Sequence, residues 1–480
     1  MDWRRSGFFF AIGSILAGQA PTDPTFRATT KLVQVSVVAH DSKGAPVADL
    51  RREEFQILDN GAPQEIRVFV AETEKRSASP PQNLAPNTFT NRISGSSGNS
   101  VIMFDNLFTG FGDPAGLDGT GFGVQKVLEA LQKIPVGERI AIYALGRKLK
   151  VIREFTTDRE SLERQLRAWK PSPDDAVTGT ALCVPAPAIS GRPGAASVVL
   201  QGQEEMVHSC IRIDSLQRAA PFDEELKQIA DHLAGIPGRK KLIWMANQFP
   251  ITPSELQRLT NAGVAIYPVN EAGVKANARN DLDAVVLEAI EDGRASYTLG
   301  FYQPIPDSPR AGSATQPEVH QLAVHVSRPG VTLRYRASYL NEPPASEPSL
   351  QDLIDALHRP VDATAIAITA SVTRAGNSVK LTEAIDLAGL DLDFIEGTWK
   401  GKAEVVARFM AVDGTEAGEV VSDTLTLNLR PATYQSMQGT GVLYRKELTV
   451  PERAVELKLL VGNLASGKIG TLTIPLPNTK

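Results

Sequence analysis

The sequence predicts an α/β protein with a doubly wound, mostly parallel sheet and helices on both faces. A small N-terminal β domain and a C-terminal β-sandwich are expected to flank this core. Three observations lead to this prediction. The chain has 480 residues, more than one compact core holds. Apolar strand patterns alternate with helical patterns through its middle, and short alternating β runs fill its last part.

The first residues have the layout of a secretory signal peptide. Two arginines precede an apolar stretch over 8–17, and the small residues 18–20 fit a cleavage site. We therefore expect residues 1–20 to be removed and the protein to be exported, periplasmic or extracellular. Pro21 disfavours cleavage directly before it, so an uncleaved anchor stays an alternative. No later segment has the length and apolarity of a membrane span, so none is expected in the mature chain.

Residues 26–72 predict the small β domain. The run "KLVQVSVVAHD" has strand character, and Asp59-Asn60-Gly61 is typical of a hairpin turn. Residues 73–98 are rich in Ser, Pro, Asn and Gly and lack apolar periodicity, which predicts a linker.

Residues 99–341 predict the α/β domain. Its first strand, "SVIMF", is apolar without alternation, as in a strand covered on both faces. Helical stripes over 124–131 and 226–233 alternate with the strand runs "RIAIYALG", "KKLIWMANQ" and "AGVAIYPVN". The run "ASYTLGFYQP" predicts another strand, and "HQLAVHVSRPGVTLRYRASYL" predicts a β pair across its Pro-Gly turn.

A second linker over 342–355 precedes the predicted β-sandwich over 356–480. Short alternating runs from "AIAITASVTR" to "GTLTIPL" follow one another at the spacing of sandwich strands. Cys183 and Cys210 are the two cysteines of the chain, and in an oxidising compartment they could form a disulfide.

The composition and the motifs do not favour an enzyme. The net charge of -5 gives no basic footprint for nucleic acid. The six histidines form no H-E-x-x-H, and no G-x-S-x-G occurs. Gly110 to Ala115 spells G-x-G-x-x-A, but Asp113 and Pro114 stand where a pyrophosphate needs bare amides. We expect no catalytic residue and no nucleic-acid partner.

Asp105 is the most informative single residue. It ends the first strand of the α/β domain, and open parallel sheets bind ligands at the carboxyl ends of their strands. Thr109 adds a hydroxyl shortly afterwards. Mg²⁺ prefers oxygen ligands of these kinds, so a divalent-cation site is one hypothesis for this loop.

Several stretches resemble the von Willebrand factor type A domain, and more closely the von Willebrand factor A-related family described mainly from acidobacteria. They are "EEFQILDNGAPQEIRVF", "ERIAIYALGRKLKVIREFTTD", "PGRKKLIWMANQFP", "SYTLGFY", "RPGVTLRYRASYL" and "SGKIGTLTIPL". The resemblance implies a non-enzymatic protein-binding or adhesion module of the cell envelope, whose partner is an unidentified protein. A metal-free structural scaffold of the periplasm or cell surface is the alternative.

The resemblance also implies where a metal-ion-dependent adhesion site would lie. Asp105 matches its first carboxylate, Thr109 its second hydroxyl, and Thr180 or Thr178 its second-loop threonine. Leu107 replaces the first serine of the motif, and Asn247 stands in place of its later aspartate. We therefore predict a degenerate site in which Asp105 caps the following loop by hydrogen bonds.

Two alternatives to the degenerate site stay open. One is a weak Mg²⁺ site, and the other is a site rewired through Asp113 or Asp118. In each case the same edge of the sheet is the predicted binding face, made of Asp105, Thr109, Thr178, Thr180 and Asn247.

Overall fold

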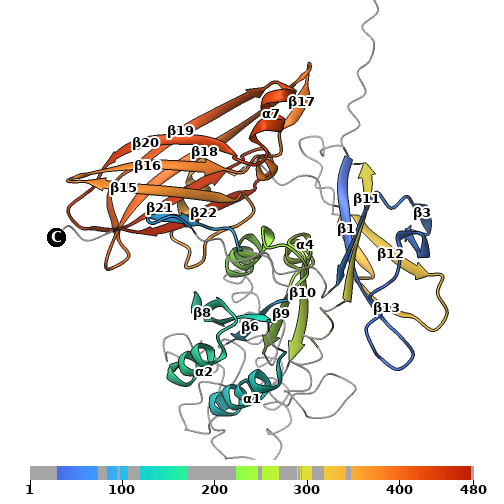
Figure 1. Cartoon of the computed structure of the whole chain (residues 1–480). Helices are drawn as coiled ribbons and strands as arrows, with labels where there is room; N and C mark the ends of the chain where they lie inside the picture. Colours follow the sequence, from blue (N-terminus) through green and yellow to red (C-terminus); the bar gives the residue numbers. More distant parts are fainter. Residues whose placement is uncertain are drawn as a thin grey trace, which may run out of the picture.

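The computed structural model of the chain contains three structured units (Figure 1). It describes residues 30–73, 84–93, 98–105, 119–135, 137–146, 148–170, 223–246, 251–269, 289, 292, 295–304, 318–341 and 348–476. The predicted signal peptide, Cys183 and Cys210 lie outside these residues. Among the residues that the structure describes, no helix is long and apolar enough to cross a membrane.

The central unit contains a five-stranded sheet. Its order is β10 (Val264–Val269), β9 (Lys240–Met245), β6 (Asn99–Asp105), β7 (Arg139–Leu145) and β8 (Leu149–Thr156). The first four strands are parallel, whereas β8 runs antiparallel to β7. Every residue of β6 is buried, as the unalternating run "SVIMF" predicts.

Helices cover both faces of this sheet, which confirms the α/β class. Val101 and Met103 share one core with a helix over 223–234 and with α4 (Pro253–Asn261). Ile102 and Phe104 share the other core with α1 (Gly119–Lys133) and α2 (Arg159–Ala168). The two cores arise because successive side chains of a strand point to opposite faces.

The N-terminal β unit is assembled from two distant parts of the chain. One sheet has the order β13 (Thr332–Arg334), β1 (Thr30–His40), β11 (Ala295–Pro304) and β4 (Val68–Thr73). The other has the order β14 (Ser338–Asn341), β12 (Glu318–Val326), β2 (Phe55–Asp59) and β3 (Ala62–Gln64), with the short helix η1 (Arg52–Glu54) before β2. Both sheets contribute to one apolar core.

These pairings correct the predicted role of residues 295–341. The sequence placed them in the α/β domain, but β11 pairs antiparallel with β1 and β4. The predicted β pair across Pro329-Gly330 is confirmed for β12 and β14, which pair antiparallel, whereas β13, directly after the turn, pairs with β1 and β12 also pairs with β2. The hairpin at 59–61 is confirmed: β2 pairs with β3, and Asn60 and Gly61 both have the positive φ of the predicted turn.

The C-terminal unit consists of two antiparallel sheets around a shared core. One has the order β20 (Val442–Thr449), β16 (Ser378–Ile385), β15 (Ile368–Ala375) and β5 (Thr88–Thr90). The other has the order β17 (Asp393–Ile395), β18 (Thr398–Ala411), β21 (Ala454–Gly462) and β22 (Ile469–Pro475), and β19 (Glu416–Leu429) pairs with β18. Two short helices, η4 (Leu387–Leu390) and α7 (Pro431–Met437), lie between its strands.

Both predicted linkers contribute structure to this sandwich. Residues 73–98 include β5, which adds an edge strand to β15, and the Asn91 side chain donates to the carbonyls of Ala363 and Ile366. Residues 342–355 include most of α6 (Leu350–Ala356), whose Leu353 packs with Val406 of the sandwich. The described parts of both segments therefore contact residues far away in the chain.

The description of a mostly parallel sheet needs a second correction. Of the five sheets in the described residues, only the central one contains parallel pairs. The antiparallel sheets of the flanking units therefore dominate the strand content, and the doubly wound pattern applies at most to the centre of the molecule.

Candidate functional site

Asp105 lies where the sequence predicts it, at the carboxyl end of a central parallel strand. β6 runs between β9 and β7, and Asp105 is opposite Leu145 of β7. Asp105 is 0 % exposed. Side chains alternate along the strand, so Asp105 is on the same face as Met103, the face covered by the helix over 223–234.

Trp244 of β9 engages the Asp105 carboxylate. The indole Nε1 donates to Asp105 Oδ2 over 2.9 Å, and both residues are 0 % exposed. The sequence predicts that Asp105 hydrogen-bonds with the following loop, which lies outside the described residues, and the Trp244 donor on the neighbouring strand was not foreseen. A buried indole N–H needs a hydrogen-bond acceptor. The tryptophan in the apolar run "KKLIWMANQ" could therefore have indicated that a neighbouring strand supplies one.

Replacing Trp244 with phenylalanine is expected to destabilise the central unit by about 1–3 kcal/mol. The substitution keeps an aromatic ring in the core but removes one donor from a buried carboxylate, which raises the cost of burying that charge. Chemical denaturation followed by far-UV circular dichroism measures the change. Trp399→Phe, in the C-terminal sandwich, is the control for loss of an indole, and a smaller effect at Trp244 than at Trp399 would contradict the role of this bond.

The remaining residues of the predicted site lie outside the described residues. They are Leu107, Thr109, Asp113, Asp118, Thr178, Thr180 and Asn247. Within the described ranges, no three His, Cys, Asp or Glu side chains converge as a metal site would require. Asp105 is thus the member of the predicted binding face that the structure describes, and the Trp244 indole is one of its contacts.

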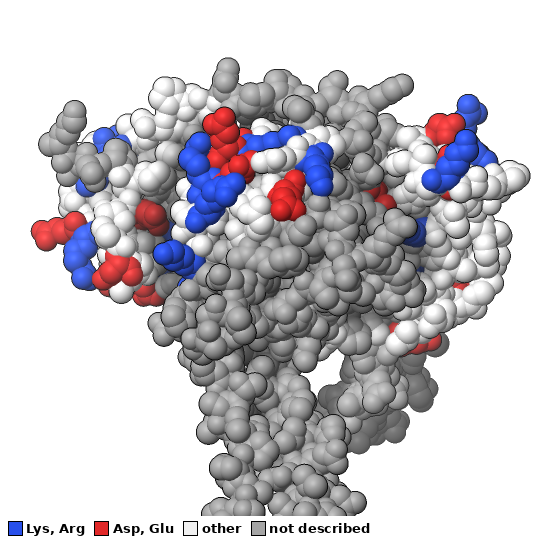
Figure 2. Space-filling model, turned by 90° about the horizontal axis from the view of Figure 1, so that it is seen from below, with Lys and Arg blue, Asp and Glu red and all other residues white. Residues whose placement is uncertain are grey.

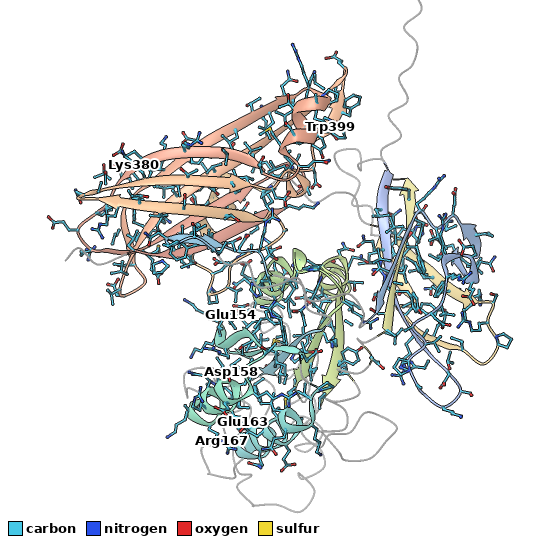
Figure 3. The ribbon with its side chains drawn as sticks, in the orientation of Figure 1. Glu154, Asp158, Glu163, Arg167, Lys380 and Trp399 are labelled. Carbon is cyan, nitrogen blue, oxygen red and sulfur yellow. The ribbon has the colours of Figure 1, made fainter. Side chains whose placement is uncertain are left out.

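A second polar cluster lies on the same face of the sheet, and the sequence did not single it out. The Tyr143 hydroxyl of β7 is 3.4 Å from the Glu154 carboxylate of β8. His232 Nε2 is 3.6 Å from Glu154, and His232 Nδ1 is 2.6 Å from the carbonyl oxygen of Asp362. A carbonyl only accepts, so Nδ1 carries a proton. The cluster links the central unit to the segment that leads into the sandwich, and Glu154 lies on the side of the unit near the sandwich (Figure 3).

The charges in this cluster favour the protonated histidine. Burial alone would lower the pKa of His232, but the Glu154 carboxylate and the Asp362 carbonyl raise it above the ordinary value of 6.5. Burial alone would raise the pKa of Glu154, but His232 lowers it below 4.5. The ion pair therefore stabilises the fold between these ordinary values. Its contribution is lost above the folded pKa of His232 and below the folded pKa of Glu154.

Raising the pH from about 6 to about 8 is therefore expected to loosen the attachment of residues 358–364 to the helix over 223–234. Hydrogen exchange of peptides from these two segments measures the loosening. In His232→Gln the protection of these amides, corrected for the intrinsic pH dependence of exchange, should not change with pH in this range, because the titrating group is gone. Equal pH dependence in both proteins would contradict the assignment to His232.

Acidic and basic side chains are mixed on the surface. On the face seen in Figure 2, the described Lys and Arg side chains lie beside Asp and Glu side chains rather than in a patch of one sign. Glu163 and Arg167 of α2 are an example, with Nη2 and Oε2 3.9 Å apart. The described charges on this face therefore form no basic patch of the kind that a polyanion needs.

No protein-family model matches the chain, and no curated protein matches it. Solved structures give distant matches. Proximal thread matrix protein 1 from the mussel byssus is 12% identical with a TM-score of 0.23, and the match covers 36% of this chain and 37% of that one. The von Willebrand factor type A protein from Catenulispora acidiphila is 9% identical with a TM-score of 0.22, covering 60% and 75%. Manganese-loaded TRAP from Plasmodium vivax is 8% identical with a TM-score of 0.24, covering 56% and 97%.

These similarities are too low to carry an argument about fold or function. The chain matches less than half of the length of the mussel protein. The fold described above rests instead on strand pairing and packing within this molecule, and the resemblance to the acidobacterial family stays a prediction from the sequence.

Proposed function

We propose that this chain is an exported, non-enzymatic protein-binding module of the cell envelope, with a central domain of the von Willebrand factor type A kind. The carboxyl edge of its parallel strands is the proposed binding face, with Asp105, Thr109, Thr178, Thr180 and Asn247 as its residues. The observation that carries the proposal is the position of Asp105, at the end of a strand with a parallel neighbour on each side. The signal-like N-terminus motivates the export.

The binding that we propose does not depend on a metal ion. Trp244 donates to the Asp105 carboxylate, and this bond fixes the carboxylate within the packed sheet. In the sequence, Leu107 and Asn247 stand where an adhesion motif would supply a hydroxyl and a carboxylate. A partner would then be held by polar and apolar contacts of the face itself, rather than by a cation shared with its acidic side chain.

A structural scaffold is the second candidate, and the contacts between the units favour it. Arg239 of the central unit donates to Ser36 Oγ of the N-terminal unit over 3.0 Å. Arg359, before the sandwich, pairs with Asp231 of the central unit at 2.7 Å, and its side chain is 6% exposed. An ion pair in which one partner is buried can help to set the relative orientation of the parts that it joins. A protein whose only task is to hold its β units apart would need these contacts and no binding face.

Capture from envelope fractions distinguishes the two candidates. We expect the full chain to retain a defined partner in the presence of EDTA, and Thr109→Arg with Thr180→Arg to lose it. Thr449→Arg, at an exposed position on β20, adds the same kind of side chain elsewhere and should retain the partner. A partner that survives the paired substitution would contradict the proposed face, and a partner released by EDTA would contradict metal independence. Finding the protein in the cytoplasm would refute export.

A further inference from the structure

A cavity of about 570 Å³ lies between the central unit and the segment leading into the sandwich. One wall is the helix over 223–234, which supplies Glu225 and Gln228. The opposite wall includes α6 and Arg359, and Lys148 from the turn between β7 and β8 closes one side. Cavities of this volume accommodate small molecules or single long side chains.

Two residues that line this cavity each carry a buried side-chain oxygen that accepts no hydrogen bond from a described residue. These oxygen atoms are Glu225 Oε2 and Gln228 Oε1. The residue Glu225 is 7% exposed. The amide orientation of Gln228 is fixed, because its Nε2 donates to Glu224 Oε1 at 3.4 Å and its oxygen is therefore the unpaired atom. The two residues are three positions apart on one helix, so their side chains are neighbours.

The chemistry of these atoms defines the missing partner. Both are acceptors, so a ligand must bring donors, and a buried acceptor without a hydrogen bond costs free energy. A neutral donor would leave the charge of Glu225 uncompensated in a buried position. A metal ion does not fit either, because no three carboxylates, histidines or cysteines converge in the described part of the chain.

The described basic residues that line the cavity do not donate to these two oxygen atoms. Lys148 lowers the pKa of Glu225 by its charge, yet Oε2 accepts no hydrogen bond from it. Arg359 is committed to Glu224 and Asp231, at 3.0 and 2.7 Å. Asp352 and Asp355 of α6 add negative charge to the far wall, although Asp352 is bound to the Ser349 N–H and Asp355 to Gln351.

We propose that this cavity binds an organic cation with N–H donors, an ammonium or guanidinium group, which donates to Glu225 and Gln228. The group can belong to a free small molecule or to a Lys or Arg side chain of another polypeptide. Charge-assisted hydrogen bonds to a buried carboxylate are among the strong ones. The site uses none of the residues of the proposed binding face and stands independently of that proposal.

Calorimetric titration of the full chain tests the site. Agmatine is the probe for a free cation, and the heptapeptide Gly-Ser-Gly-Arg-Gly-Ser-Gly, in which the arginine is flanked by uncharged residues, is the probe for a side chain of another polypeptide. We expect saturable binding of at least one probe, weakened roughly tenfold or more by Glu225→Gln. Lys148→Met removes a competing positive charge and should tighten binding severalfold. Binding of agmatine alone identifies a small-molecule site, and binding of the peptide identifies a site for a basic side chain.

Two controls separate this site from general charge effects. Glu163→Gln removes one negative charge from α2, at a distance from the sandwich (Figure 3), and should leave the affinity unchanged. Tetramethylammonium carries the charge without N–H donors and should not compete with agmatine. No saturable binding of either probe up to about 10 mM, or equal affinity in wild type and Glu225→Gln, would overturn the proposal. Unchanged circular dichroism of Glu225→Gln shows that lost binding is not lost folding.

The pH dependence of binding provides a second readout. Burial and the neighbouring Glu224 raise the pKa of Glu225 to about 7, against the opposing charge of Lys148. Affinity for a cation should therefore rise as the pH passes through about 7 in the wild type. The other charged groups around the cavity are Glu224, Lys227, Lys148, Asp352, Asp355, His358 and Arg359. A rise that persists in Glu225→Gln would assign the effect to another of these groups and contradict the role of Glu225.

Discussion

Replacing Glu138 with alanine is expected to destabilise the central unit by about 3–5 kcal/mol. Glu138 precedes β7 and accepts from Lys241 Nζ of β9 at 2.7 Å and from Ser100 Oγ of β6 at 2.6 Å. The side chains of Lys241 and Glu138 are 1% and 9% exposed. Without the Glu138 carboxylate, the buried ammonium of Lys241 loses this ion pair, and such a loss costs more than the pair itself contributes.

Hydrogen exchange of peptides from β6 and β9 measures this loss in the full chain, because it reports the local free energy of opening. A paired replacement, Glu138→Leu with Lys241→Met, removes both charges and should recover most of the stability. Glu163→Gln on α2 is the surface control and should change the opening free energy by less than about 0.5 kcal/mol. An effect of Glu138→Ala as small as that of the control would contradict the buried ion pair.

Replacing Glu383 with methionine is expected to stabilise the sandwich at pH 8 by several kcal/mol. Glu383 is 0 % exposed, on the face of β16 that carries Leu381 and Ile385, and neither carboxyl oxygen has a hydrogen-bond partner among the described residues. Burial raises its pKa from 4.5 to about 8. Between these values the folded state holds a proton that the unfolded state has lost. Each pH unit in this interval then costs about 1.4 kcal/mol of stability.

The wild-type sandwich should therefore lose stability as the pH rises from about 4.5 to about 8, by an amount on the order of 5 kcal/mol from this group alone. Subtracting the curve of Glu383→Met removes the contributions of other groups, such as Asp423, whose pKa is lowered by Lys446 and Tyr444. Exchange protection of β15, β16 and β20 is the measurement, and Glu419→Gln, at an exposed position on β19, is the control. Parallel curves for wild type and Glu383→Met would contradict this account.

Local patterns in the sequence predicted elements well and their partners poorly. The run "SVIMF" identifies β6 as a strand covered on both faces, and "DNG" identifies the hairpin between β2 and β3. In contrast, "ASYTLGFYQP" was assigned to the parallel sheet. Tyr297, Leu299 and Phe301 alternate along it and all enter the N-terminal core, a period of two that is typical of an antiparallel strand. The partner, β1, lies more than two hundred residues earlier, and no local signal selects it.

The same limit applies to the candidate site. Asp105 could be placed at the end of its strand, because a carboxylate after an apolar run is visible in the sequence. Its contact with Trp244 depends on β9 pairing beside β6, which is a property of the sheet order. The unpaired oxygens of Glu225 and Gln228 could not be predicted from the sequence either. Whether a polar side chain on a helix lacks a hydrogen bond depends on the segment that packs against it, here the segment around Arg359.

The central claim is that Asp105 is a hydrogen-bonded structural carboxylate on a binding face that works without a cation. Calorimetric titration of the full chain with Mg²⁺ and with Mn²⁺, comparing wild type with Asp105→Asn and with Thr109→Ala plus Thr180→Ala, tests it most directly. The account predicts no saturable binding that depends on these residues, with identical heats for all three proteins. Saturable binding to the wild type that both variants lose, with their circular dichroism unchanged, would contradict it.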